Sequence, residues 1–123
     1  MTAFSDLVGL CRELEGRSGR LDKLDLVADF LRRLPAEDVG TAVAFLTGRP
    51  FAASDPRVLG VGGLPSPEGP GGPPLALGDV AEAFAAVAEA TGSGSRRARE
   101  ARLAALASRA SDPERALLAR IIG

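Results

Sequence analysis

The residues with the clearest chemical potential form the run TGSGSRR at positions 91–97. Gly92 and Gly94 allow the backbone to come close to a ligand, and Ser95 is placed to cap a helix that follows. The first N–H groups of that helix would be free to point at an oxyanion. The run predicts an anion-binding loop or an ordinary hairpin between two helices, and the pattern alone leaves both readings open.

Arginines dominate the helix expected after this run, in which Glu100 is the one acid. They are Arg96, Arg97, Arg99, Arg102 and Arg109. At about 100° per residue, Arg96 and Arg99 share a face with the buried residues further along, one turn too early. Because an unpaired arginine is not expected in a core, we expect the first turn to project past it. A basic first turn opposes the helix dipole, which favours a role in binding a phosphate backbone.

Other chemistries lack the residues they need. The run is not a Walker A loop, because GxxxxGK[ST] is absent, and no strand precedes it as a dinucleotide-binding fingerprint requires. The chain has no histidine, one cysteine (Cys11) and one lysine (Lys23). A histidine-based triad, a histidine general base and a cysteine zinc site are therefore excluded. We do not expect this chain to be a complete enzyme.

Composition favours a helical domain. The hydrophobic fraction is 46%, largely Ala and Leu, with five Phe and neither Trp nor Tyr. The net charge of −1 means that any nucleic-acid site must be local. The single cysteine, the lack of a signal-peptide pattern and the lack of a long apolar run together predict a cytoplasmic protein with no membrane partner.

Apolar periodicity predicts an all-α fold, a compact bundle of about six helices in antiparallel hairpins. The expected helices are 4–15, 20–34, 35–46, 78–90, 96–109 and 112 to the end, the last after the capping box SDPE. In the second and third helices the expected inward residues are Leu24, Val27, Ala28, Leu31 and Leu34, then Val39, Val43 and Leu46. Leu26 and Phe30 widen the face of the second helix, so we expect it to pack on two sides.

The middle of the chain is rich in proline and glycine, which supply 10 of the 13 residues at 62–74. No helix or central strand tolerates that share, so we expect a flexible surface loop at 64–74. Val58, Leu59 and Val61 predict that 55–63 is tucked onto the domain. Residues 1–123 are expected to form a single domain. Because apolar residues of the last helix run up to Gly123, we expect it to be cut from a longer protein.

The order of these features resembles the N-terminal DNA-binding domain of ATP-dependent DNA ligases. The matching pieces cover nearly the whole chain: FSDLVGLCRELEGRSGRLDKLDLVADFL (4–31), AVAFLTGRPF (42–51), LGVGG (59–63), DVAEAFAAVAEATGSGSRRAREARLAAL (79–106) and ERALLARIIG (114–123). Each piece is weak alone, but the ordered combination is specific. The proline- and glycine-rich stretch at 64–74 departs from the family pattern.

The resemblance implies a domain that grips nicked double-stranded DNA through the minor groove and the phosphate backbone, without base specificity. Backbone contacts would come from the TGxGS hairpin, here Gly92, Ser93, Gly94 and Ser95. Phosphates would be neutralised by Arg96, Arg97, Arg99 and Arg102, and the LGVGG segment would add Gly60, Gly62 and Gly63.

Catalysis in this family belongs to later domains, where a K-x-D-G lysine is adenylated. No K-x-D-G occurs in this chain, so no cofactor is expected here, whereas ATP and Mg²⁺ are expected for the parent enzyme. The expected partners are nicked DNA and the catalytic domains of the same ligase, at work in DNA replication, repair or recombination. The alternative is a helical protein–protein interaction module. That reading gains if Glu82, Glu89 or Glu100 pairs off the arginines.

Overall fold

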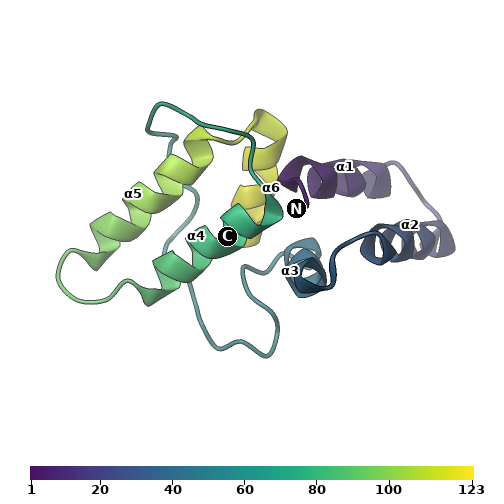
Figure 1. Ribbon diagram of the computed structural model, residues 1–123, viewed down its shortest axis with the longest axis horizontal. Helices are drawn as coiled ribbons and strands as arrows, with labels where there is room; N and C mark the ends of the chain where they lie inside the picture. Colours follow the sequence, from purple (N-terminus) through teal and green to yellow (C-terminus); the bar gives the residue numbers. More distant parts are fainter.

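The computed structural model describes residues 1–123 and consists of six helices joined by turns and loops (Figure 1). They are α1 (Phe4–Glu15), α2 (Arg20–Arg32), α3 (Ala36–Leu46), α4 (Leu77–Glu89), α5 (Ser95–Ser108) and α6 (Asp112–Ile122). The one extended pairing is an isolated antiparallel bridge between Ala3 and Ala76. The predicted all-α fold is confirmed, with every expected helix present.

Local capping explains where the last helix begins. The Ser111 hydroxyl accepts a hydrogen bond from the Glu114 N–H at 3.3 Å, and the Glu114 carboxylate accepts one from the Ser111 N–H at 2.8 Å. Pro113 follows in the first turn of α6, where its missing N–H costs nothing. The capping box read from the sequence is therefore present in full.

Three phenylalanine rings form the centre of the core. Phe45 of α3 packs edge-on against Phe4 of α1, with 6.2 Å between ring centroids, and against Phe84 of α4 at 5.5 Å. All three side chains are fully buried. Leu103 of α5 and Leu118 of α6 belong to the same cluster. The core therefore joins all six helices, and α2 contributes only Phe30 to it.

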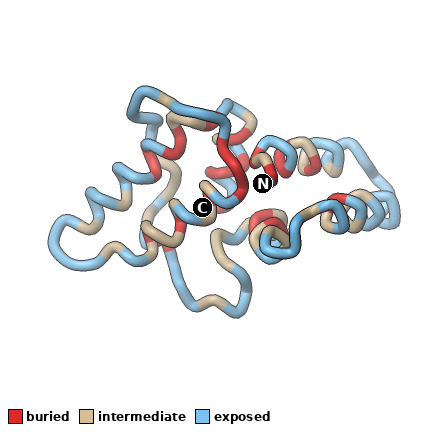
Figure 2. Tube along the Cα trace, viewed as in Figure 1, coloured by how far each residue is buried: buried red, intermediate tan, exposed pale blue.

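The second helix lies at the edge of the fold, and its expected two-sided packing is wrong. Phe30 is its one buried residue, and the Leu24 side chain is 55% exposed. Figure 2 shows α2 largely exposed beside α1. In α3 the expected inward face is also partly wrong, because Val43 is exposed whereas Ala42 and Phe45 are buried. This helix is apolar around most of its circumference, so periodicity does not distinguish the face that packs.

The long loop between α3 and α4 is anchored at several points. Leu59 is buried and Val61 half-buried, as predicted, but Val58 is 73% exposed, so its expected contact is wrong. Further along, the Glu68 N–H donates to the Ala104 carbonyl at 3.1 Å, and Arg109 Nε donates to the Pro73 carbonyl at 3.1 Å. The segment 64–74 therefore contacts α5, and its flexibility stays a prediction.

The two helical hairpins extend in opposite directions along the molecule. Residues 91–94, between α4 and α5, lie at one end of the long axis, and residues 16–19, between α1 and α2, lie at the other (Figure 1). No helix has the length and apolar character needed to cross a membrane. The arginine-rich start of α5 thus forms one tip of the domain.

Candidate nucleic-acid interface

Two left-handed glycines shape the α4–α5 hairpin. Gly92 has φ 86° and Gly94 has φ 80°, a conformation that residues with a Cβ rarely adopt. The Ser95 N–H donates to the Gly92 carbonyl at 3.2 Å, and the Ala98 N–H donates to the Gly94 carbonyl at 3.1 Å. Gly94 is therefore the N-cap, and Ser95 is the first residue of α5. The expectation that the Ser95 side chain caps the helix is wrong, because it already lies inside the first turn.

Several backbone N–H groups at this tip have no acceptor within the chain. They belong to Ser93, Gly94, Arg96 and Arg97. Gly92, Ser93 and Gly94 are exposed. Unsatisfied amides at a helix start carry partial positive charge, which attracts anions. The hairpin therefore offers backbone donors to an anion, as the sequence predicted.

The arginine side chains around these amides are mostly exposed. Arg96 forms an ion pair with Glu100 at 3.3 Å, but its side chain is 90% exposed, and such pairs contribute little. Arg97 and Arg102 are exposed and have no acidic partner within 4.0 Å. Neither Glu82 nor Glu89 forms an ion pair with them. The helix tip therefore keeps most of its positive charge.

Arg99 behaves differently from its neighbours. Its side chain is half-buried, and Nη2 donates to the Ala90 carbonyl at 2.6 Å. Its Nε is buried without a partner. The expectation that the whole first turn projects past the core is thus wrong for Arg99, because a backbone carbonyl accepts from its guanidinium inside the hairpin.

The glycine segment 60–63 meets α5 through one residue. Gly60 has φ 69°, and a Cβ at this position would lie 3.1 Å from Arg99 Nη1. At Gly62 and Gly63 a Cβ would meet no atom within 4 Å. The structure therefore brings Gly60 and the start of α5 together, whereas Gly62 and Gly63 are not constrained by packing.

A groove of about 360 Å³ beside Gly60 contains two arginines that the sequence analysis did not single out, Arg49 and Arg57. Arg57 donates to Asp55, with a shortest distance of 2.8 Å, and lies over the Phe51 ring at 4.5 Å. These hydrogen bonds lower the pKa of Asp55 below its ordinary value. Arg49 is exposed and has no acidic partner. The spacing of residues in the sequence could not predict this groove, because most of its lining comes from a loop without regular secondary structure.

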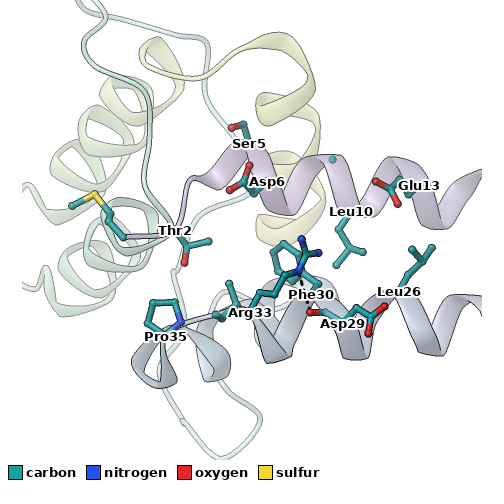
Figure 3. A pocket seen from close by; sticks show the side chains of 13 residues that line it. Thr2, Ser5, Asp6, Leu10, Glu13, Leu26, Asp29, Phe30, Arg33 and Pro35 are labelled. Atoms are coloured by element: carbon teal, nitrogen blue, oxygen red, sulfur yellow. Dashed lines mark hydrogen bonds between the residues drawn. The ribbon is translucent and has the colours of Figure 1, made fainter.

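A second cavity, of about 710 Å³, lies between α1 and α2 and contains none of the predicted site residues. Figure 3 shows Asp6 and Glu13 along α1, Asp29 on α2 and Arg33 just past the end of α2, with Leu10 and Phe30 between the helices. It lies near the opposite end of the molecule from the α4–α5 hairpin (Figure 1). The two sites therefore differ in both position and charge.

Comparison with known proteins gives a consistent result. The chain is 34% identical over 126 residues to a probable DNA ligase from Anaeromyxobacter sp. (strain K), covering 97% of this chain and 24% of that protein. It is 37% identical to a probable DNA ligase from Beutenbergia cavernae, covering 99% of this chain and 22% of that protein. The chain resembles one domain of a DNA ligase. A DNA ligase 1 from Korarchaeum cryptofilum is also similar, at 32% identity over 97% of this chain and 28% of that protein.

The matches confirm the DNA ligase resemblance inferred from the motifs. The chain spans about a quarter of the length of the DNA ligases it matches. No protein-family model matches it, and no solved structure matches it. The exposed hairpin and its arginines thus lie in a chain that is similar to one part of much longer proteins.

Proposed function

We propose that this chain is the DNA-binding domain of an ATP-dependent DNA ligase that seals nicks in double-stranded DNA. The observation that carries the proposal is the α4–α5 tip, where free amides and exposed arginines occur in a chain similar to DNA ligases along nearly its full length. ATP and Mg²⁺ act in the catalytic domains of the parent enzyme. The domain works with those domains in the cytoplasm, during replication, repair or recombination.

The hairpin binds the phosphate backbone by two kinds of contact. The free amides of the tip, those of Ser93, Gly94, Arg96 and Arg97, donate to phosphate oxygens. The side chains of Arg96, Arg97 and Arg102 neutralise phosphate charge. The tip offers backbone amides, hydroxyls and guanidinium groups, all of which suit phosphate oxygens, and it has no asparagine or glutamine that would read adenine. Binding therefore follows the backbone and the minor groove and does not depend on sequence.

The protein-interaction module is the competing function. It gains support if acids of the same surface form ion pairs with the tip arginines, because DNA binding by those arginines is then less favoured. Glu100 engages Arg96 at an exposed site, and Arg97 and Arg102 have no such partner. This free positive charge favours a polyanionic partner.

Titration with nicked duplex DNA tests the proposal. The unaltered chain is compared with R96A/R97A and with the control R17A/R20A, which removes two exposed arginines without acidic partners at the opposite end. If each tip arginine neutralises one phosphate, the double variant lowers the slope of log K against log salt by about 2. Between 50 and 200 mM salt, that difference corresponds to a change of about tenfold in relative affinity.

The expected result is a reduced slope for R96A/R97A and an unchanged slope for R17A/R20A. Duplexes of different sequence should give equal affinities. Absence of binding at low salt, or equal slopes for all three proteins, would overturn the proposal and leave the interaction module as the better description.

A further inference from the structure

We propose that Arg99 is a positioning residue that fixes the α4–α5 hairpin against the Gly60 segment, and that it does not act as a phosphate ligand. Only the predicted effect of Arg99 on DNA binding rests on the proposed function. Its structural content stands on contacts within the free protein. It also assigns Gly60 a packing role in place of a direct contact with DNA.

The first contact closes the base of the hairpin. The chain leaves α4 at Ala90 in an extended conformation (φ −69°, ψ 120°), without the left-handed glycine that often satisfies the last carbonyls of a helix. Arg99 Nη2 supplies the missing donor to the Ala90 carbonyl at 2.6 Å. A guanidinium at the C-terminal end of α4 also complements the helix dipole. The hydrogen bond therefore links the end of one helix to the start of the next.

The second contact explains the glycine at position 60. Its backbone is left-handed, and a Cβ would lie 3.1 Å from Arg99 Nη1 and 3.5 Å from the guanidinium carbon. A side chain at this position would be strained and would push the guanidinium away from Ala90. Gly60 thus allows the guanidinium to lie between the loop and the hairpin.

The enclosure of Arg99 argues against a direct role with DNA. Its Nε is buried and its Nη2 is engaged, whereas Arg96 and Arg97 on the same turn are exposed. Arg99 therefore has fewer donors free for a phosphate than its two exposed neighbours. Arg99 instead holds the two arms of the hairpin together, and this sets the direction in which its two neighbours point.

The first test uses the free protein. R99A should lower the melting temperature by about 5 °C. R99K should lower it as well, because lysine keeps the charge but lacks the planar fork of donors. The amides of Ser95 and Ala98, which donate within the turn, should exchange with solvent faster in both variants. R97A, which removes an exposed and unpaired arginine, should neither lower the melting temperature nor speed the exchange of these amides. An unchanged melting temperature and unchanged exchange in R99A would overturn the proposal.

A double-mutant cycle tests the link with Gly60. G60A should destabilise the chain, and G60A combined with R99A should cost less than the sum of the single changes, because the clash is then absent. G48A is the matched control, since Gly48 is also left-handed, with φ 77°, but a Cβ there meets nothing within 4 Å. Strict additivity of G60A and R99A would show that the two residues are not coupled.

DNA binding gives the final distinction. For a positioning residue, R99K should lose affinity for nicked duplex nearly as R99A does, while a phosphate ligand would be rescued by lysine. Full rescue by R99K would overturn the proposal. If the unaltered chain binds no DNA, the proposed function fails, whereas melting and exchange still decide the role of Arg99.

Discussion

Phe45 is the residue on which the packing of the core should depend most. Its ring is fully buried and makes edge contacts with Phe4 and Phe84, so it joins α1, α3 and α4. Replacing a buried phenylalanine by alanine costs about 3–5 kcal/mol, through lost transfer energy and the cavity left behind. The two aromatic contacts place F45A in the middle of that range or above it, at about 4 kcal/mol.

Urea unfolding followed by far-ultraviolet circular dichroism measures this cost. A domain of this size has a free energy of unfolding of about 6–18 kcal/mol, so F45A should still fold. With a slope of about 2 kcal/mol per molar urea, its midpoint should fall by about 2 M. V43A on the same helix is the control, because Val43 is 42% exposed and its truncation should cost less than about 1 kcal/mol. Equal midpoints for F45A and V43A would refute this packing.

Two further predictions concern a helix cap and a thiol. S111A should cost about 1 kcal/mol and lower the melting temperature by about 4 °C, because the Glu114 N–H loses its acceptor; an unchanged melting temperature would contradict this. Burial raises the pKa of Cys11 above its ordinary value of 9.0, although Arg120 opposes the shift. Since the folded state disfavours the thiolate, the contribution of Cys11 to stability should be constant at pH values well below 9 and should be lost as the pH rises through and above 9. The unaltered chain should therefore lose more stability than C11A in this range; equal losses in the two proteins would refute the assignment.

The sequence predicted best those helices that pack on one defined face. In α4 and α5 the apolar residues at helical spacing are buried, including Val80, Phe84, Val87, Leu103 and Leu106. Both helices have a polar opposite face, so periodicity identifies the buried side without ambiguity. Glycines and the Ser111 capping box marked the helix ends for the same local reason, since caps involve residues close in sequence.

Prediction failed where the packing partner decides the outcome. The α3 sequence AEDVGTAVAFL is apolar on more than one side. Phe45 lies in the core because Phe4 and Phe84 both pack against it. In α2, Leu24 belongs to an apolar stripe, but no other helix covers that part of the edge. A pattern reports which faces could be buried, whereas tertiary contacts determine which one is.

The same distinction applies to the candidate interface. Helical phase placed Arg99 on the apolar face, and that part of the prediction is confirmed by its half-buried position. The further conclusion, that the whole first turn of α5 projects past the core, assumed that no hydrogen-bond acceptor for Arg99 was available there. The Ala90 carbonyl accepts from Arg99 Nη2, and Gly60 leaves space for the guanidinium; neither feature can be recognised before the loop is placed.

The charges at the helix starts connect stability with the proposed function. Every helix except α5 carries at least one acid in its first turn. Each such charge contributes about 0.3–1 kcal/mol, and α5 instead begins with Arg96 and Arg97 beside free amides. The arrangement is unfavourable in the free domain, and in the proposed function a bound phosphate would relieve it by accepting from the free amides and the arginine side chains. An unfavourable local arrangement of charges is expected at a surface that binds a partner. Contacts elsewhere in the domain must then keep that surface in its conformation. Arg99 provides such a contact at the base of the hairpin, so the tip can remain charged and still keep its shape.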